Sequence, residues 1–149
     1  MTVLIRIGLA ALFLDELVVG GWNSIAPESF YRDFPTVDLT PPFSEHYARD
    51  FGGATLGIAL LLVIAFMRPY AHFVIPAALS FTTFSVPHFL FHATHLEGAT
   101  AGEAIALTTA NAAVALLGPA IILATTVRDR RDRRDLRRST GISRAHPPV

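Results

Sequence analysis

Long apolar runs alternate with short polar stretches along this chain. A helix needs about 20 residues to cross the hydrocarbon core of a bilayer, and four segments are apolar over roughly that length. The predicted spans are Val3 to Trp22, Tyr47 to Met67, Tyr70 to Leu96 and Glu103 to Val127. We therefore expect an all-α fold, built as a bundle of four transmembrane helices. Small residues in the first two spans favour close helix contact in lipid; they are Gly8, Gly20, Gly21, Gly52, Gly53 and Gly57.

The loop between the first two spans, residues 24–45, combines prolines with aromatic residues. Its prolines are Pro27, Pro35, Pro41 and Pro42, and its aromatic residues are Phe30, Tyr31, Phe34 and Phe43. The stretch PESFYRDF predicts a short interfacial helix that has Pro27 in its first turn. We expect this loop to fold back over the outer end of the bundle as a cap.

The composition favours a membrane protein, and the charges give it an orientation. Hydrophobic residues make up 52% of the 149 residues, and there is no cysteine for a disulfide or a thiolate metal site. The formal net charge is zero, but eight arginines lie between Arg128 and Arg144. Because basic segments beside a span stay in the cytoplasm, we predict a membrane domain over residues 1–127 and a disordered cytoplasmic tail over residues 128–149. Both termini are then cytoplasmic, and loop 24–45 faces the outside or periplasm of a multi-pass plasma-membrane protein.

The basic tail also bears on the expected partners. A charge run beside a predicted span is typically solvated, and it is attracted to anionic lipid. We therefore expect the lipid bilayer as a partner and no nucleic acid.

The stretch SVPHFLFHATHLEG, residues 85–98, places three histidines inside the third predicted span. Positions three and four apart share a face of an α-helix, so His88, His92 and His95 fall in a stripe about 60° wide. The second span carries a matching pair, because His46 and Asp50 are also four residues apart. Each pattern concentrates ligating side chains on one helix face.

The rise of a helix places the two sets at similar heights. At about 1.5 Å per residue, Asp50 lies roughly 25 Å from the inner end of its span and His88 roughly 28 Å from the same level. His46 and His92 each lie one turn further out. On antiparallel neighbouring helices, the two sets are predicted to face each other near the outer surface. Three further polar residues are expected at a similar height: Asp15, Glu16 and Asn111.

These side chains suit a transition metal. Imidazole and carboxylate ligands without sulfur fit copper, iron or zinc, and bundles commonly hold metal through helices that offer ligands at i and i+4. The sequence therefore predicts one or two metal ions near the outer face, with the ligands His46, Asp50, His88, His92 and His95. Glu16 is predicted to orient a ligand or to act as a base. In the enzymatic form of this hypothesis, a membrane oxidoreductase, the metal activates water or dioxygen beside a lipid-soluble substrate.

Three alternatives stand beside the metal hypothesis. Histidines at a membrane interface also meet water and headgroups without holding any ion. His46 together with His88 or His92 is suited to ligating a haem. In the third alternative the chain is an accessory subunit of a larger respiratory or redox membrane complex, or a homo-oligomer, and the polar cluster serves contacts between helices.

Several short motifs resemble those of a known group of proteins. RIGLAALFL opens the first span, APE follows it, and RDFGGATLGIALLL opens the second. Over about residues 4–127 the chain resembles the DoxX-like group of small four-span bacterial membrane proteins. The phrases HYARDFGG and PHFLFH are similar to small actinobacterial membrane proteins of unassigned function. The resemblance implies a four-helix bundle with a link to membrane redox complexes, and it supplies no catalytic residues.

Overall fold

The computed structural model describes residues 1–39 and 42–143, and all regular secondary structure within them is helical. In chain order the elements are α1 (Thr2–Ile25), α2 (Pro27–Asp33), the short 3₁₀ helix η1 (Val37–Leu39), α3 (Glu45–Met67), α4 (Ala71–Thr94) and α5 (Ala101–Ser143). The prediction of an all-helical bundle is confirmed.

Among the described helices, three are long and apolar enough to cross a membrane. They are α3, α4 and the Ala101–Ser139 part of α5. Helix α1, which carries Arg6, Asp15 and Glu16, is not one of the three. A fourth span and the cytoplasmic placement of both termini therefore stay predictions.

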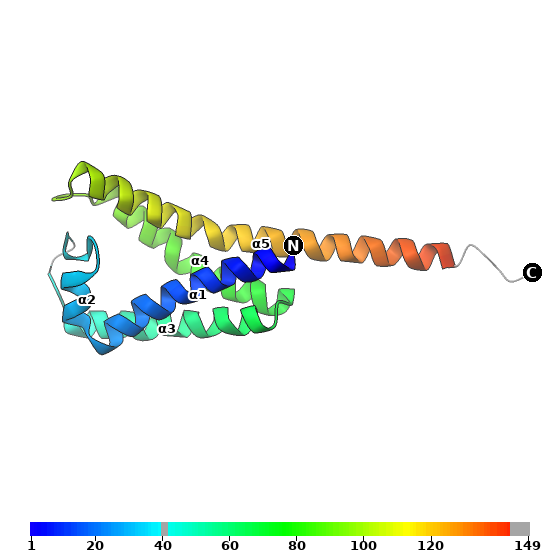
Figure 1. Cartoon of the computed structure of the whole chain (residues 1–149), viewed down its shortest axis with the longest axis horizontal. Helices are drawn as coiled ribbons and strands as arrows, with labels where there is room; N and C mark the ends of the chain where they lie inside the picture. Colours follow the sequence, from blue (N-terminus) through cyan, green and yellow to red (C-terminus); the bar gives the residue numbers. More distant parts are fainter. Residues whose placement is uncertain (40–41, 144–149) are drawn as a thin grey trace, which may run out of the picture.

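The long helices form a bundle of two antiparallel pairs (Figure 1). Helix α1 packs most extensively along α3, and α4 packs along α5. One end of the bundle carries α2 and the turn between α4 and α5 (Figure 1). The N-terminus lies at the opposite end, beside the point where α5 leaves the bundle (Figure 1). The chain thus places its N-terminus and its basic segment at the same end.

Local sequence signals account for the helix starts. Helix α2 is the short helix that the sequence predicts, and Pro27 stands in its first turn, where a missing N–H costs nothing. Ser44 caps α3, because its hydroxyl accepts a hydrogen bond from the Tyr47 backbone N–H at 3.4 Å. At the start of α5, the carboxylate of Glu103 accepts from the Thr100 N–H at 2.8 Å, and Thr100 Oγ1 accepts from the Glu103 N–H at 3.3 Å. This reciprocal capping box fixes the turn between α4 and α5.

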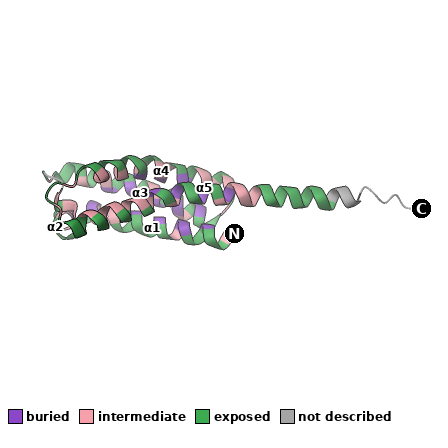
Figure 2. Cartoon of the chain, turned by 90° about the horizontal axis from the view of Figure 1, so that it is seen from above, coloured by how far each residue is buried: buried purple, intermediate pink, exposed green. Residues whose placement is uncertain are grey.

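The hydrophobic core that all four long helices share lies toward the end that carries the N-terminus. We call this region the packed half, and Figure 2 colours its buried residues purple. Its core comprises Ile5, Leu9 and Leu12 of α1, Leu62 and Ala65 of α3, Val74, Ala77, Ala78 and Phe81 of α4, and Ile121 of α5. No described residue of the half that carries α2 belongs to this core cluster.

Two glycines bring α1 and α3 into close contact. A Cβ on Gly20 would lie 2.5 Å from Thr55 Oγ1 and 3.0 Å from the Gly52 carbonyl oxygen. A Cβ on Gly52 would lie 2.7 Å from the Ser24 backbone nitrogen and 2.8 Å from the Gly20 carbonyl oxygen. Only glycine therefore permits this separation of the two backbones. Gly21, Gly53 and Gly57 meet no such neighbour within 4 Å.

Helix α5 continues beyond the bundle as a basic extension (Figures 1 and 2). The run of charges predicts disorder from residue 128, whereas the structure shows helix as far as Ser143. Arginine is a good helix former, and neither glycine nor proline occurs between Pro119 and Gly141. Extending an existing helix also avoids the cost of nucleation. At the base of this extension, the Arg128 guanidinium donates to the Pro69 carbonyl at 2.8 Å, which ties α5 to the turn between α3 and α4.

Candidate functional site

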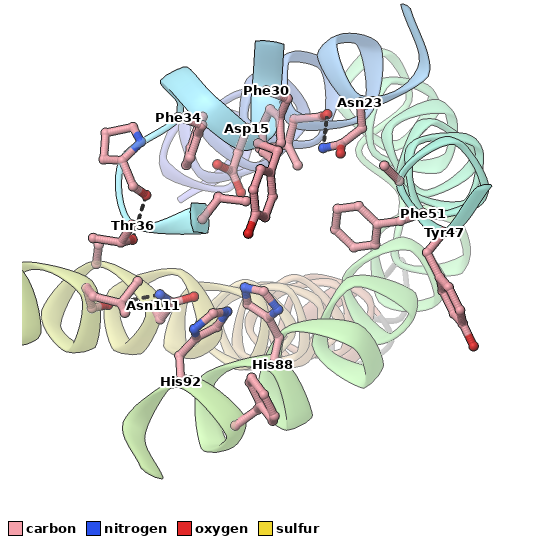
Figure 3. Close-up of a pocket in the computed structure, with 18 of the residues that line it drawn as sticks. Asp15, Asn23, Phe30, Phe34, Thr36, Tyr47, Phe51, His88, His92 and Asn111 are labelled. Atoms are coloured by element: carbon pink, nitrogen blue, oxygen red, sulfur yellow. Dashed lines mark hydrogen bonds between the residues drawn. The ribbon is translucent and has the colours of Figure 1, made fainter. Parts of the chain in front are cut away.

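A cavity of about 730 Å³ occupies the half of the bundle opposite the packed half. Helices α1, α3, α4 and α5 form its walls, and α2 with residues 34–37 and 42–43 covers it. We call the space that these walls and this cover enclose the capped cavity. Figure 3 shows side chains from these elements converging on it. The cavity and the packed half therefore divide the bundle along its length.

The wall from α1 carries two carboxylates. The inward stripe of α1 runs from Leu9 and Leu12 through Glu16 to Gly20, at helical spacing. Glu16 thus stands where the pattern calls for an apolar residue. Its side chain is only 2% exposed, and neither carboxylate oxygen has a hydrogen-bond partner among the described residues. The neighbouring Asp15 also lines the cavity but is exposed.

The wall from α4 carries two histidines. Figure 3 shows His88 and His92 side by side, with Asp15 and Phe30 across the cavity from them. Their ring centroids lie 4.5 Å apart, and His88 also packs against Phe84 at 5.2 Å. Two imidazoles at this separation repel each other if both are charged. At least one of them is therefore expected to be neutral, with a lone pair that can accept a hydrogen bond.

Other polar side chains in the walls are largely self-satisfied. The amide nitrogen of Asn23 donates to the Val19 carbonyl at 2.9 Å, and that of Asn111 donates to the Leu107 carbonyl at 2.9 Å (Figure 3). Ser85 is the exception, because its hydroxyl is buried with no partner in the described structure. Among the described residues, the buried side-chain groups that line the cavity without a hydrogen-bond partner are therefore the Glu16 carboxylate and the Ser85 hydroxyl.

Aromatic rings hold the cover in place. Phe30 and Phe34 of the α2 region stack at 4.7 Å, and both meet the Trp22 ring edge-on at 5.6 Å and 6.3 Å. The Trp22 indole N–H also donates to Ser29 Oγ at 3.2 Å. Trp22 therefore joins the end of α1 to α2 through both ring packing and a hydrogen bond.

Replacing Trp22 by alanine is expected to loosen the cover while leaving the bundle folded. Aromatic pairs of this kind contribute about 0.5–1.5 kcal/mol each beyond their buried area. Backbone amides of residues 27–34 should then exchange with solvent roughly tenfold faster, which corresponds to about 1.4 kcal/mol. Hydrogen–deuterium exchange followed by mass spectrometry measures this directly. Tyr70→Ala, at the other end of the bundle, is the control, and equal exchange over residues 27–34 in both variants would contradict the assignment.

The structure brings together part of the predicted site. Three of its residues line the capped cavity, namely Glu16, His88 and His92, together with Asp15 and Asn111. Three predicted ligands lie elsewhere, namely His46, Asp50 and His95. The His46 and Asp50 side chains are 84% and 67% exposed and pair with each other at 3.3 Å. The His95 ring stacks on Phe91 at 4.1 Å, and its Nδ1 lies 2.9 Å from the Phe91 carbonyl oxygen.

The prediction of a metal site is therefore wrong. Within residues 1–39 and 42–143, no group of three or more histidine, aspartate or glutamate side chains is placed to hold an ion. The physical reason is the rotation of α3, which turns Ala48 and Phe51 toward the cavity and leaves the exposed His46 and Asp50 on its outer side. The predicted facing wall does not form. Haem binding and membership of a larger complex stay predictions.

Some cavity residues were not anticipated. Ser85 opens the histidine stretch and lies three and seven residues before His88 and His92, so helical spacing alone could have placed it on their face. Phe84 and Phe91 also line the cavity, although nothing in their spacing separates them from lipid-facing rings.

No family model, curated protein or solved structure matches this chain. The resemblance to the DoxX-like group accordingly stays a prediction.

Proposed function

We propose that this chain is a multi-pass membrane protein that binds a lipid-soluble small molecule in the capped cavity. The observation that carries the proposal is the cavity itself, of about 730 Å³, with mainly apolar and aromatic walls and a few convergent polar groups. Ligand sites typically have volumes of about 300–1,000 Å³ and this kind of lining. The packed half shows that these helices can fill their interior with side chains, so the hollow half is a specific feature of the fold.

The outward faces of the bundle support a membrane setting. Large apolar side chains are exposed on all four long helices, including Leu4 at 70%, Ile7 at 61%, Leu60 at 60%, Leu79 at 50%, Leu116 at 68% and Leu123 at 65%. Apolar surface of this extent is unfavourable in water and matches the hydrocarbon of a bilayer.

The charge distribution supports an orientation for the proposed membrane protein. The basic extension begins at Arg128, at the end of the bundle opposite α2 (Figure 1). Basic segments stay on the cytoplasmic side. The cavity and its cover would then face the outside or the periplasm, where a ligand could enter from the outer leaflet.

Filling the cavity is expected to abolish binding. Ala110 of α5 lines the cavity, whereas Ala113, one turn further along, is exposed and does not line it. The Ala110→Phe variant should lose affinity for a neutral probe, 4-phenylbutanol, by roughly tenfold or more, because the added ring takes up ligand volume. Ala113→Phe should bind as the wild type does. Equilibrium binding in lipid nanodiscs measures both variants, and empty nanodiscs correct for partition into lipid.

The proposal would be abandoned if wild-type nanodiscs took up no more probe than empty ones. It would also fail if Ala110→Phe and Ala113→Phe bound the probe equally, because the cavity would then not be the site.

A further inference from the structure

The capped cavity has an uneven charge. Within the described part of the chain, its lining includes the carboxylates of Asp15 and Glu16 and no arginine, and the sequence contains no lysine. The basic side chains among the described lining residues are the two imidazoles of His88 and His92. A site of this composition favours a positive charge over a negative one.

Glu16 differs from the other acidic side chains near this end of the bundle. Asp33 pairs with Arg32 at 2.8 Å, and the hydrogen bond from Arg32 holds the pKa of Asp33 below its ordinary value. Glu45 pairs with Arg49, also at 2.8 Å. Each of these carboxylates lies on the surface with a guanidinium as its partner. Glu16 is buried and has none among the described residues.

A buried carboxylate without a partner is unstable as an anion. It requires either a proton or a cation that enters the cavity. Arg32 and Arg49, which lie at this end of the bundle, are already engaged with Asp33 and Glu45. No guanidinium lines the cavity within the described part of the chain. The charge of Glu16 is therefore balanced by a proton while the cavity is empty, and by a cationic head when such a ligand binds.

Aromatic rings around the carboxylates add a second source of attraction. Phe30 and Phe34 stack over the cavity from the cover, and Phe51, Phe84 and Phe91 line its walls. The faces of such rings attract organic cations, by up to about 2 kcal/mol when the site excludes water. The same rings supply the apolar contact that the body of a lipid-soluble molecule needs.

From these observations we infer that the occupant of the cavity is a lipophilic organic cation, an amine whose ammonium head pairs with the Glu16 carboxylate. This inference rests on the proposed function, and it names the ligand class of that site. The head donates to Glu16, and a neutral imidazole of His88 or His92 accepts a further N–H. The apolar body lies among the phenylalanine rings beneath α2.

Three probes with the same apolar body and different heads test the inference. They are 4-phenylbutylamine, which is cationic near neutral pH, the neutral 4-phenylbutanol, and the anionic 5-phenylpentanoate. Equilibrium binding is measured for the full chain in lipid nanodiscs, with empty nanodiscs as the reference for partition. The wild type is expected to bind the amine at least about tenfold more tightly than the alcohol, and the carboxylate most weakly.

The Glu16→Gln variant keeps the shape of the side chain and removes its charge. It is expected to bind the amine about tenfold more weakly and the alcohol as the wild type does, so that the preference disappears. Glu28→Gln is the matched control, because it makes the same change at an exposed carboxylate of α2 that does not line the cavity, and it should keep the preference.

The outcomes separate this inference from the proposed function. If the alcohol binds as tightly as the amine, or if the carboxylate binds best, the cation inference is overturned while the cavity remains a binding site. If none of the three probes binds the wild type, both proposals are overturned. A preference for the amine that persists in Glu16→Gln would overturn the role of Glu16. The comparison of the three probes is made on the wild type, so it tests the cation inference even if a variant fails to fold.

Discussion

The Gly52→Ala variant is expected to unfold several degrees below the wild type. The new methyl group would lie 2.7 Å from the Ser24 backbone nitrogen and 2.8 Å from the Gly20 carbonyl oxygen. Both neighbours are backbone atoms, so relief requires α1 and α3 to move apart. Overpacking of this kind destabilises a fold by about 1–3 kcal/mol. For a chain near this length, each kcal/mol lowers the unfolding temperature by roughly 2–4 °C.

The adjacent glycine provides the control for this prediction. A Cβ on Gly53 meets nothing within 4 Å, and alanine is a better helix former than glycine by about 1 kcal/mol. Gly53→Ala should therefore unfold at or above the wild-type temperature. Thermal unfolding of the detergent-purified protein, followed by circular dichroism, measures both variants. Equal melting of Gly52→Ala and Gly53→Ala would show that α1 and α3 are not in close contact at this point.

The contact between α1 and α3 explains why the sequence placed the α4 wall of the site correctly and the α3 wall wrongly. Spacing establishes that His46 and Asp50 share a face of α3, but it does not say which way that face points. In a soluble protein the apolar face would point inward, whereas a helix in lipid is apolar on its outer side as well. Hydropathy therefore gave no orientation for α3.

The small residues of α3, unlike its hydropathy, indicate which side of the helix contacts α1. The buried stripe of α3 includes Gly52, Thr55 and Ala59. At about 100° per residue, Asp50 lies roughly 200° from Gly52, on the opposite side of the helix. Reading this stripe as the contact face would have placed His46 and Asp50 outside the bundle.

Height along the bundle was more predictable than rotation. Glu16, His88 and Asn111 come from three different helices, and helix rise alone placed them at a similar level. All three line the same cavity. The rise of 1.5 Å per residue is nearly constant between helices, whereas the rotation of each helix depends on its neighbours. The cavity volume depends on all the side chains together, so no local pattern could predict it.

The Glu16→Leu variant is expected to stabilise the protein, whereas Gly52→Ala destabilises it. Both oxygens of Glu16 are buried without a hydrogen-bond partner among the described residues. A buried polar group in this state is unfavourable by about 1–3 kcal/mol, judged from mutational data. Leucine continues the apolar stripe of Leu9 and Leu12 on α1. The unfolding temperature should therefore rise by several degrees, at roughly 2–4 °C per kcal/mol.

Asp15→Leu serves as the comparison for this gain. Asp15 also lines the cavity but is more exposed than Glu16, so its replacement should raise the unfolding temperature less than Glu16→Leu does. A lower unfolding temperature for Glu16→Leu than for the wild type would mean that Glu16 has a stabilising partner in the folded chain. The cation inference would then lose its basis.

Replacing Glu16 should raise the stability of the empty protein and weaken its binding of the amine. A ligand that binds only the folded protein raises its unfolding temperature by mass action. Adding 4-phenylbutylamine should therefore raise the unfolding temperature of the wild type, while that of Glu16→Leu stays nearly constant because the variant has lost the partner of the ammonium head. A carboxylate that destabilises the empty protein and is satisfied only by its ligand behaves as a binding group. If Glu16 were a structural residue instead, its replacement would lower the unfolding temperature both with and without the amine.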